Sequence, residues 1–240
     1  MKRIAIPVLI LITLLILNCR GSAWALDPVD IGVEIHAGWF NFSNSYSNQS
    51  LDQNLDSHPI RGIGIEARQG RFSLELSADW IKTNVQQSFL EVFALPPFLI
   101  IEQTVTLKGN LTIVPILLTE RFHLGTEKGV LDPYIGVGGG YYILSYDPTS
   151  TATSLLPVGP STTTSPSHDI KFHNTVGAHA NLGVDIRITP AVTFTIDGRY
   201  VWAYAKIFYK GNLSDLNSVA GPLSLNGWVT TFGIKYYFKN

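Results

Sequence analysis

The feature that most constrains the fold is the strict alternation of apolar and polar side chains in residues 177–188, GAHANLGVDIRI. The even-numbered residues of this segment are all apolar, whereas the odd-numbered ones are glycine or His179, Asn181, Asp185 and Arg187. Successive side chains of a strand point to opposite faces, so the segment predicts a strand with one apolar and one polar face.

The same period recurs along the chain. Seven further segments show it, at residues 31–39, 62–68, 72–80, 113–124, 130–145, 192–205 and 227–238. Short connections, at 69–71, 125–129 and 189–191, alternate with long ones, at 43–59, 83–112, 146–171 and 206–226. Antiparallel pairing then places every short turn at one end. We therefore predict an all-β fold: an eight-stranded antiparallel transmembrane β-barrel with four long extracellular loops and short periplasmic turns.

A secreted β-sandwich, with the apolar faces buried in a core, is the alternative fold. Eight such strands would need charged faces toward water, yet only 15% of the residues are charged. In a closed barrel the apolar faces meet lipid, and every backbone group is satisfied within the wall. These points favour the barrel.

The N-terminus predicts a secretory signal peptide, residues 1–25, cleaved after Ala25. Lys2 and Arg3 precede an apolar run over residues 4–17, and Ala23 and Ala25 supply the small residues of a cleavage site. Residues 26–240 are then a single outer-membrane β-barrel domain. We expect export by the secretory pathway to the outer membrane of a Gram-negative bacterium.

The composition of the mature chain argues against several functions. Without Lys2, Arg3 and Arg20 it keeps 14 basic and 18 acidic residues, a net charge of −4, so nucleic acid is not expected as a partner. The only cysteine, Cys19, lies in the signal peptide, and no G-x-S-x-G motif occurs. The histidines lack the spacing of metal ligands. We expect no catalytic residue, no metal and no cofactor, and predict that the chain is not an enzyme.

Aromatic side chains are predicted to form a girdle at each rim of the barrel. The girdle at the loop end comprises Trp39, Trp80, Trp202 and Trp228. The opposite girdle comprises Phe72, Phe122, Tyr134, Tyr236 and Phe238.

The polar faces of the strands are predicted to meet inside the barrel as a lumen polar network. Its members are Glu34, His36, Glu66, Arg68, Glu75, Asp79, Arg121, His123, His179, Asp185, Arg187, Asp197, Arg199 and Lys235. An eight-stranded barrel has little more room than its own side chains fill, so these groups must pair. The sequence suggests pairs two residues apart on one face, Asp197 with Arg199 and Asp185 with Arg187. Two interpretations stay open: a structural plug of ion pairs, or a polar floor beneath a substrate vestibule. The alternation does not fix the strand near Pro115, where Glu120 points outward unless a bulge intervenes.

An apolar run, FLEVFALPPFLII at 89–101, falls in a predicted loop, where exposed apolar side chains usually mark an interaction surface. The candidates for a hydrophobic pocket are Phe89, Phe93, Leu95, Phe98 and Leu99. In one account the third and fourth strands extend beyond the membrane and turn these side chains inward. In the other they only cap the barrel. The Ser/Thr/Pro-rich segment 147–169 is expected to be a mobile surface loop.

Four segments occur in a characteristic order: VLDPYIGVGGGYYI (130–143), GAHANLGVDIRI (177–188), FTIDGRYVWA (194–203) and GWVTTFGIKYYF (227–238). Together they resemble the OmpW family of small outer-membrane β-barrel proteins. The resemblance implies a monomeric eight-stranded barrel that admits small hydrophobic compounds through a narrow, gated interior. The chain departs from the family pattern in two places: Lys239 and Asn240 follow the closing Phe238, and Pro115 stands alone where the family has paired prolines.

The leading functional prediction is passive passage of small hydrophobic molecules, through an apolar extracellular mouth with lateral exit to the membrane. The alternative is a structural or surface-interaction barrel with a plugged lumen and no transport. The expected partners are outer-membrane lipid and lipopolysaccharide, a small hydrophobic ligand, and the barrel-assembly machinery, which would bind the C-terminal strand. We expect a monomer.

Overall fold

The computed structural model describes residues 29–43, 58–95, 99–125, 129–156, 169–210 and 218–238. The predicted signal peptide, residues 1–25, lies outside these ranges. Within them, no helix has the length and apolar character needed to cross a bilayer.

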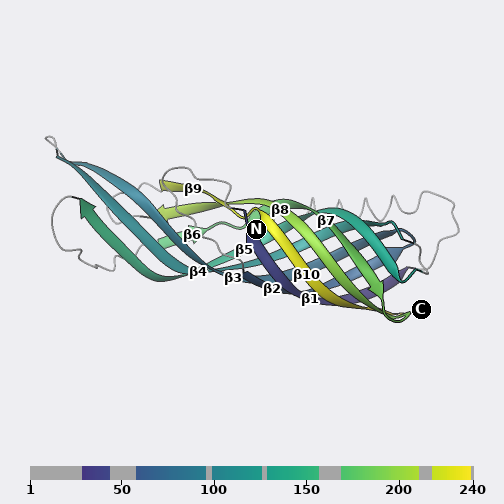
Figure 1. Cartoon of the computed structure of the whole chain (residues 1–240). Coiled ribbons are helices and arrows are strands. Elements are labelled where there is room, and N and C mark those ends of the chain that lie inside the picture. The colour runs from purple at the N-terminus through teal and green to yellow at the C-terminus, as the bar shows by residue number, and fades with distance from the viewer. Residues whose placement is uncertain are drawn as a thin grey trace.

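The described chain forms antiparallel strands that close into a barrel (Figure 1). The strands are β1 (Asp30–Phe42), β2 (His58–Gln69), β3 (Phe72–Leu95), β4 (Leu99–His123), β5 (Leu131–Leu156), β6 (Asp169–Phe172), β7 (Thr175–Arg187), β8 (Val192–Lys210), β9 (Ser218–Ser224) and β10 (Gly227–Phe238). Eight of them follow one another around the wall in the order β10-β1-β2-β3-β4-β5-β7-β8, and β8 pairs with β10 to close it. The predicted eight-stranded antiparallel barrel is confirmed.

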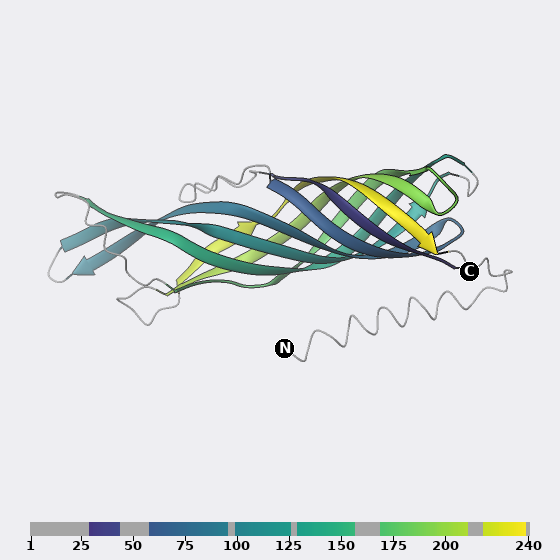
Figure 2. The ribbon, with the colours of Figure 1, turned by 90° about the horizontal axis from the view of Figure 1, so that it is seen from below.

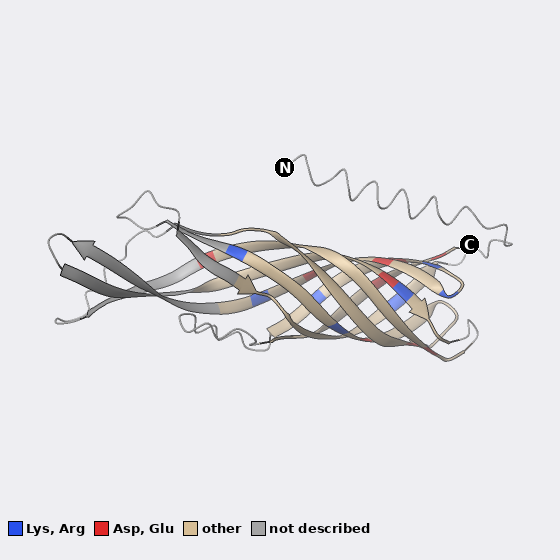
Figure 3. Cartoon of the chain, turned by 90° about the horizontal axis from the view of Figure 1, so that it is seen from above, with Lys and Arg blue, Asp and Glu red and all other residues tan. Residues whose placement is uncertain are grey.

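Side chains alternate across this wall as the sequence pattern predicts. On β1, Ile35 is 65% exposed on the outer surface, whereas its neighbours Glu34 and His36 are buried inside. Ile63 on β2 and Leu182 on β7 are similarly exposed. Most of the strand length carries uncharged residues, with a few charged ones between them (Figure 3). An apolar outer belt of this kind requires an apolar surrounding, which lipid supplies.

Several strands are longer than a membrane crossing requires. β3, β4 and β5 have 24, 25 and 26 residues, whereas about 9–11 residues suffice to cross. They project past one end of the barrel (Figure 2), which we call the loop end, and the short connections lie at the turn end. The predicted loop 83–112 is therefore wrong in its bounds, because the β3–β4 ladder continues to the pair Leu95–Leu99.

The short strands β6 and β9 were also not predicted. Both pair with the outer part of β8; β6 begins within the predicted loop 146–171 and ends one residue beyond it, and β9 lies within the predicted loop 206–226. Beyond the bilayer a strand no longer needs an apolar outward face. The alternation that reveals the membrane-crossing segments is therefore absent there.

The connections at the turn end are tight. Gly70, between β2 and β3, has φ 58°, a conformation that side chains with a Cβ rarely adopt. Between β7 and β8, the Thr189 hydroxyl accepts hydrogen bonds from the amides of Ala191 and Val192, at 3.3 and 3.0 Å. Such hydroxyl–backbone bonds stabilise a sharp reversal.

Pro115 interrupts the β3–β4 ladder without changing its register. Ala78 pairs with Ile116 and Ile81 with Ile113, and no pairs form between them at Val114 and Pro115. Glu120 is exposed, so the alternation is unbroken and no bulge occurs at Pro115. The register shift in β4 lies instead between Lys108 and Gly109, in its pairing with β5.

Candidate functional site

The interior of the barrel changes character along its axis. Inward-facing residues toward the turn end are mostly polar, and those of the same strands toward the loop end are mostly apolar. On β3, Asp79 is the last charged inward residue before Ile81. On β8, Arg199 is followed inward by Val201. We call the two regions the polar layer and the apolar layer.

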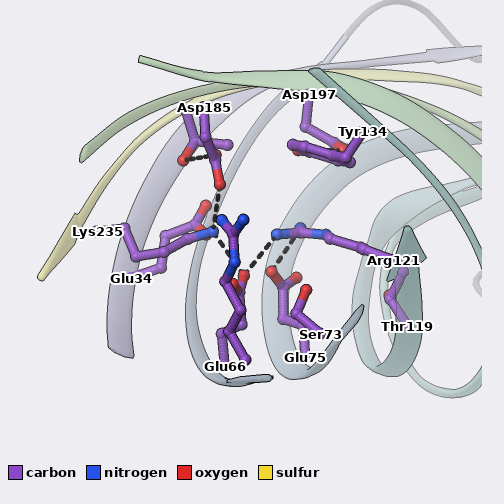
Figure 4. Close-up of polar contacts among 12 residues, drawn as sticks. Glu34, Glu66, Ser73, Glu75, Thr119, Arg121, Tyr134, Asp185, Asp197 and Lys235 are labelled. Carbon is purple, nitrogen blue, oxygen red and sulfur yellow. Dashed lines mark hydrogen bonds and ion pairs between the residues drawn. The ribbon is translucent and has the colours of Figure 1, made fainter. Parts of the chain in front are cut away.

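The centre of the polar layer is a carboxylate that two cations share. Lys235 from β10 and Arg121 from β4 converge on Glu66 of β2 (Figure 4), with N–O distances of 2.6 and 3.0 Å to Oε2. Arg121 also contacts Glu75 at 2.5 Å, and Lys235 contacts Asp185 at 3.3 Å. These five side chains come from β2, β3, β4, β7 and β10, so they tie the whole cross-section together.

A second group lies where the polar layer meets the apolar layer. The Arg199 guanidinium is 3.6 Å from Asp197 and 3.7 Å from Asp79. His36 contacts Asp79 through Nε2 at 2.5 Å. The Tyr134 hydroxyl donates a hydrogen bond to Asp197 at 2.8 Å. Each charge at this boundary therefore lies within 4 Å of an opposite charge, although the Arg199 contacts are longer than those at the centre.

The turn end of the polar layer is held by Asp132. Its carboxylate lies 2.6 Å from Arg68 and 3.0 Å from His123, and it also accepts a hydrogen bond from the Gly125 amide at 3.2 Å. The His123 Nε2 atom in turn contacts the Ser73 hydroxyl at 3.0 Å. The sequence analysis did not predict Asp132 as a lumen residue, although it lies an even number of positions from the inward-facing Gly136 and Gly138 of the same strand.

The apolar layer fills the barrel above Asp79 and Arg199. It consists of Phe40, Ile60, Ile81, Leu111, Ile113, Leu117, Tyr142, Leu144, Val201, Ala203, Ala205, Leu223, Leu225 and Val229. Its side chains leave a cavity of about 10 Å³, bounded on the polar side by Asp79 and Arg199. The layer is therefore closed by its own side chains. Sequence reasoning missed it, although the inward positions of β1 change from Glu34 and His36 to Phe40.

The structure buries every predicted lumen residue except Arg187. Arg187 ends β7 and is only partly buried at the turn end. Asp185, which the sequence suggested as its partner, contacts Lys235 and accepts a 2.8 Å hydrogen bond from Thr195.

The predicted pocket residues fall where the structure describes little. Phe98 lies outside the described residues, and only the backbone is described at Phe89, Phe93, Leu95 and Leu99. The paired backbones of β3 and β4 run through this region, as one of the two accounts requires. The inward orientation of these side chains stays a prediction.

The predicted girdle tryptophans lie on the outer wall. Trp39, Trp80, Trp202 and Trp228 are about half exposed, and the Tyr200 ring packs against both Trp202 and Trp228. At the other rim, Phe72 packs on Phe122 and Tyr236 on Phe238. Tyr134 was wrongly assigned to that rim: it is buried in the polar layer, where its ring packs against Arg121.

One cluster of the polar layer has the residue types of a metal site. Glu66, His123 and Asp185 each offer one ligand atom, and these atoms lie within 4.8 Å of one another, the only such group in the described part of the chain. The Lys235 ammonium, however, contacts both Glu66 and Asp185. A cation of the protein itself thus already neutralises these carboxylates, and the residues do not fit a metal ion.

Comparison with known proteins agrees with this architecture. The OmpW family matches residues 101–238, which is more than half of the chain. The outer membrane protein OprG from Pseudomonas aeruginosa is similar in fold, with 15% identity, a TM-score of 0.55, and coverage of 88% of this chain and 95% of that chain. A protein of Rickettsia conorii that is named a putative outer membrane protein is 28% identical over 127 residues, which are 52% of this chain and 43% of that protein. The match therefore spans less than half of that relative.

The family match runs from β4 to β10 and so includes the charged residues Arg121, Asp185, Asp197, Arg199 and Lys235 of the polar layer. The closed eight-stranded wall has the fold of OprG. The chain therefore belongs to the OmpW family, whose members are non-enzymatic β-barrels of the bacterial outer membrane.

Proposed function

We propose that this barrel lets small hydrophobic molecules pass from outside the cell into the apolar layer and then sideways into the membrane. The observation that carries the proposal is the position of the apolar layer, which lies toward the loop end and is bounded on its other side by the paired charges of Asp79 and Arg199. A hydrophobic molecule that enters there meets a favourable surface and then a barrier.

The polar layer argues against straight passage to the turn end. The side chains of Lys235, Glu66 and Arg121 are at most 1% exposed, so no water-filled path separates them. Leaving one charge of such a buried pair without its partner costs about 3–5 kcal/mol. A hydrophobic molecule offers no hydrogen bonds in return, so it would leave by another route.

The wall beside the apolar layer supports a lateral exit between β3 and β4. Pro115 has no amide hydrogen to donate, and the ladder is interrupted at Val114 and Pro115. Pro115 also lines the small cavity of the apolar layer, together with Ile81 and Ile113. A molecule held in the apolar layer would therefore lie against the part of the wall where inter-strand pairing is interrupted.

Uptake by vesicles with a lipopolysaccharide outer leaflet tests this proposal, with N-phenylnaphthylamine as the fluorescent hydrophobic probe. We expect uptake to be faster with the native barrel than in protein-free vesicles. Pro115→Val should slow uptake several-fold, because valine restores the amide hydrogen that can pair β4 with β3 and so close the interruption in the wall. Pro133→Val is the matched control, since Pro133 is an exposed residue of β5 at the turn end. Equal uptake by Pro115→Val and the native barrel would contradict the lateral exit.

The second candidate is a structural or surface-interaction barrel without transport. The observation that favours it is the filling of the apolar layer: a cavity of about 10 Å³ holds no more than about one water molecule. In that case the native barrel would admit the probe no faster than protein-free vesicles do. The same assay therefore decides between the two functions.

A further inference from the structure

A second hollow lies on the outside of the barrel, where β1, β2 and β3 run side by side. It is a groove of about 650 Å³ on the lipid-facing surface. Trp39 and Trp80 border it, and the small residues Ala37 and Pro59 lie between them. We call it the outer groove.

The strand register explains why a groove forms here. Pro59 of β2 pairs with Trp39 of β1, and Arg61 pairs with both Ala37 of β1 and Trp80 of β3. The rings of Trp39 and Trp80 thus lie diagonally opposite each other, with the smaller Ala37 and Pro59 between them. The surface is hollow because alanine and proline occupy the positions between them.

Two cations line this groove. Arg61 and Lys82 are exposed on the outer wall, on adjacent strands and near the tryptophans. The pairing of Arg61 with Trp80 makes them diagonal neighbours, and like charges at such positions repel one another. A cation on the lipid face of a barrel also destabilises it, by an amount that grows with depth.

Among the described side chains, no carboxylate compensates these charges. In the interior, Arg68, Arg121 and Lys235 each contact a carboxylate. By contrast, neither Arg61 nor Lys82 has a carboxylate partner among the residues that the structure describes. An anion from outside the protein would compensate these two charges.

We infer that the outer groove binds the phosphate of a lipid A molecule of the outer leaflet. A guanidinium group grips phosphate through two parallel hydrogen bonds, and the Lys82 ammonium adds a second charge. Tryptophans mark the level of the membrane interface, where lipid phosphates lie. Beside the cations, Ala37 and Phe232 line the groove with apolar surface for an acyl chain. The groove therefore offers cations for the phosphate of the lipid and an apolar surface for its acyl chain.

The position in the membrane selects lipid A over a phospholipid. The outer groove lies toward the loop end of β1, β2 and β3, and the loop end of such barrels faces the outer leaflet. The lipid of that leaflet is lipopolysaccharide, whose lipid A anchor carries phosphates. Phospholipids of the inner leaflet would meet the turn end, away from the groove.

Native mass spectrometry of the purified full-length mature barrel in detergent tests this inference, with lipid A, dephosphorylated lipid A and phosphatidylglycerol as probes. The native barrel is expected to retain lipid A and to bind dephosphorylated lipid A at least about tenfold more weakly, as expected for the loss of a charge-assisted hydrogen bond. Equal retention of the two forms would overturn the inference, and so would tighter binding of phosphatidylglycerol than of lipid A.

Variants locate the site. Arg61→Gln with Lys82→Gln should weaken lipid A binding about tenfold or more. Lys206→Gln is the matched control, because Lys206 is an exposed cation on the outer wall of β8, outside the groove. Ala37→Phe should also weaken binding, since it fills the groove but keeps both charges. All four substitutions in these three variants lie on the outer wall, and heat-modifiable migration on gels checks that each barrel is folded. Binding by the double variant as tight as native would assign the lipid to another surface.

Discussion

Lys235 illustrates how single residues hold charge inside this barrel. Its side chain is 0% exposed, and its ammonium lies within 4 Å of Glu66, Asp185 and Glu34. Each of these carboxylates comes from a different strand. Removing an enclosed ion from water costs several kcal/mol, which only such close and multiple partners offset. The charges of the polar layer therefore stabilise one another, and replacing any one of them leaves a buried charge without its partner.

Replacing Lys235 by methionine should lower the free energy of unfolding by about 3–5 kcal/mol, because Glu66 and Asp185 would keep their charges without the ammonium. Urea unfolding in detergent micelles, followed by tryptophan fluorescence, measures the change. Combining Lys235→Met with Glu66→Gln should cost less than the sum of the two single changes, since the two groups interact directly. Arg71→Gln, at the exposed β2–β3 turn, is the control and should change stability by about 0.5 kcal/mol or less. A loss below about 1 kcal/mol for Lys235→Met would contradict the account of the polar layer.

The sequence could predict which residues face inward, but not how they pair. Alternation placed Lys235 and Glu66 on inward faces, yet these residues are 169 positions apart. The pairs that the sequence suggested lay on one strand. Asp197 and Arg199 do contact each other at 3.6 Å, whereas Asp185 turns to Lys235. Cross-barrel pairs depend on the stagger of the strands, which local pattern does not contain.

At the scale of the strands, glycines allow close packing inside a narrow wall. A Cβ added to Gly138 of β5 would overlap the backbone oxygen of Leu118 on β4 and the ring of His179 on β7. One added to the adjacent Gly139 would meet only the Gly177 oxygen, at 3.5 Å. The inward glycine thus makes room for the side chains of its neighbours, and the outward one does not.

This difference predicts opposite outcomes for two adjacent substitutions in β5. Gly138→Ala should destabilise the barrel by about 1–3 kcal/mol, because backbone atoms have to move to admit the methyl group. Gly139→Ala should be neutral within about 0.5 kcal/mol. Urea unfolding of both variants in the same detergent gives the comparison. Equal stability of the two would mean that β4, β5 and β7 do not approach as closely as described.

The limits of sequence reasoning also show at the strand scale. Within the membrane, lipid on one side and packed side chains on the other impose a strict period, so eight strands could be predicted. Outside the membrane that period is lost, so the sequence predicts a loop at 83–112 where the β3–β4 ladder continues to Leu95–Leu99. The apolar layer was missed for the opposite reason. Near the loop end both faces of β1 are apolar, as Trp39 and Phe40 show, so alternation disappears where the interior changes.

For the whole molecule, the account rests on one arrangement in space. An apolar belt faces lipid, and the interior is filled by a polar layer and an apolar layer that exclude water. The proposed lateral passage and the lipid A site both depend on it. The first needs a sealed turn end, and the second needs the outer wall to lie within the outer leaflet.

Nitroxide labels attached to single cysteines along β1, from Ile31 to Trp39, test this arrangement most directly in lipid bilayers. The only native cysteine, Cys19, precedes the predicted cleavage site, so the mature chain offers no competing thiol. We predict that collisions with oxygen, which concentrates in lipid, alternate with a period of two and peak at Ile31, Val33, Ile35 and Ala37. Labels at the inward Glu34 and His36 should be immobile and shielded from both oxygen and a water-soluble nickel reagent. Free access of the nickel reagent to those two labels, or no alternation at all, would contradict a lipid-facing wall around a packed interior.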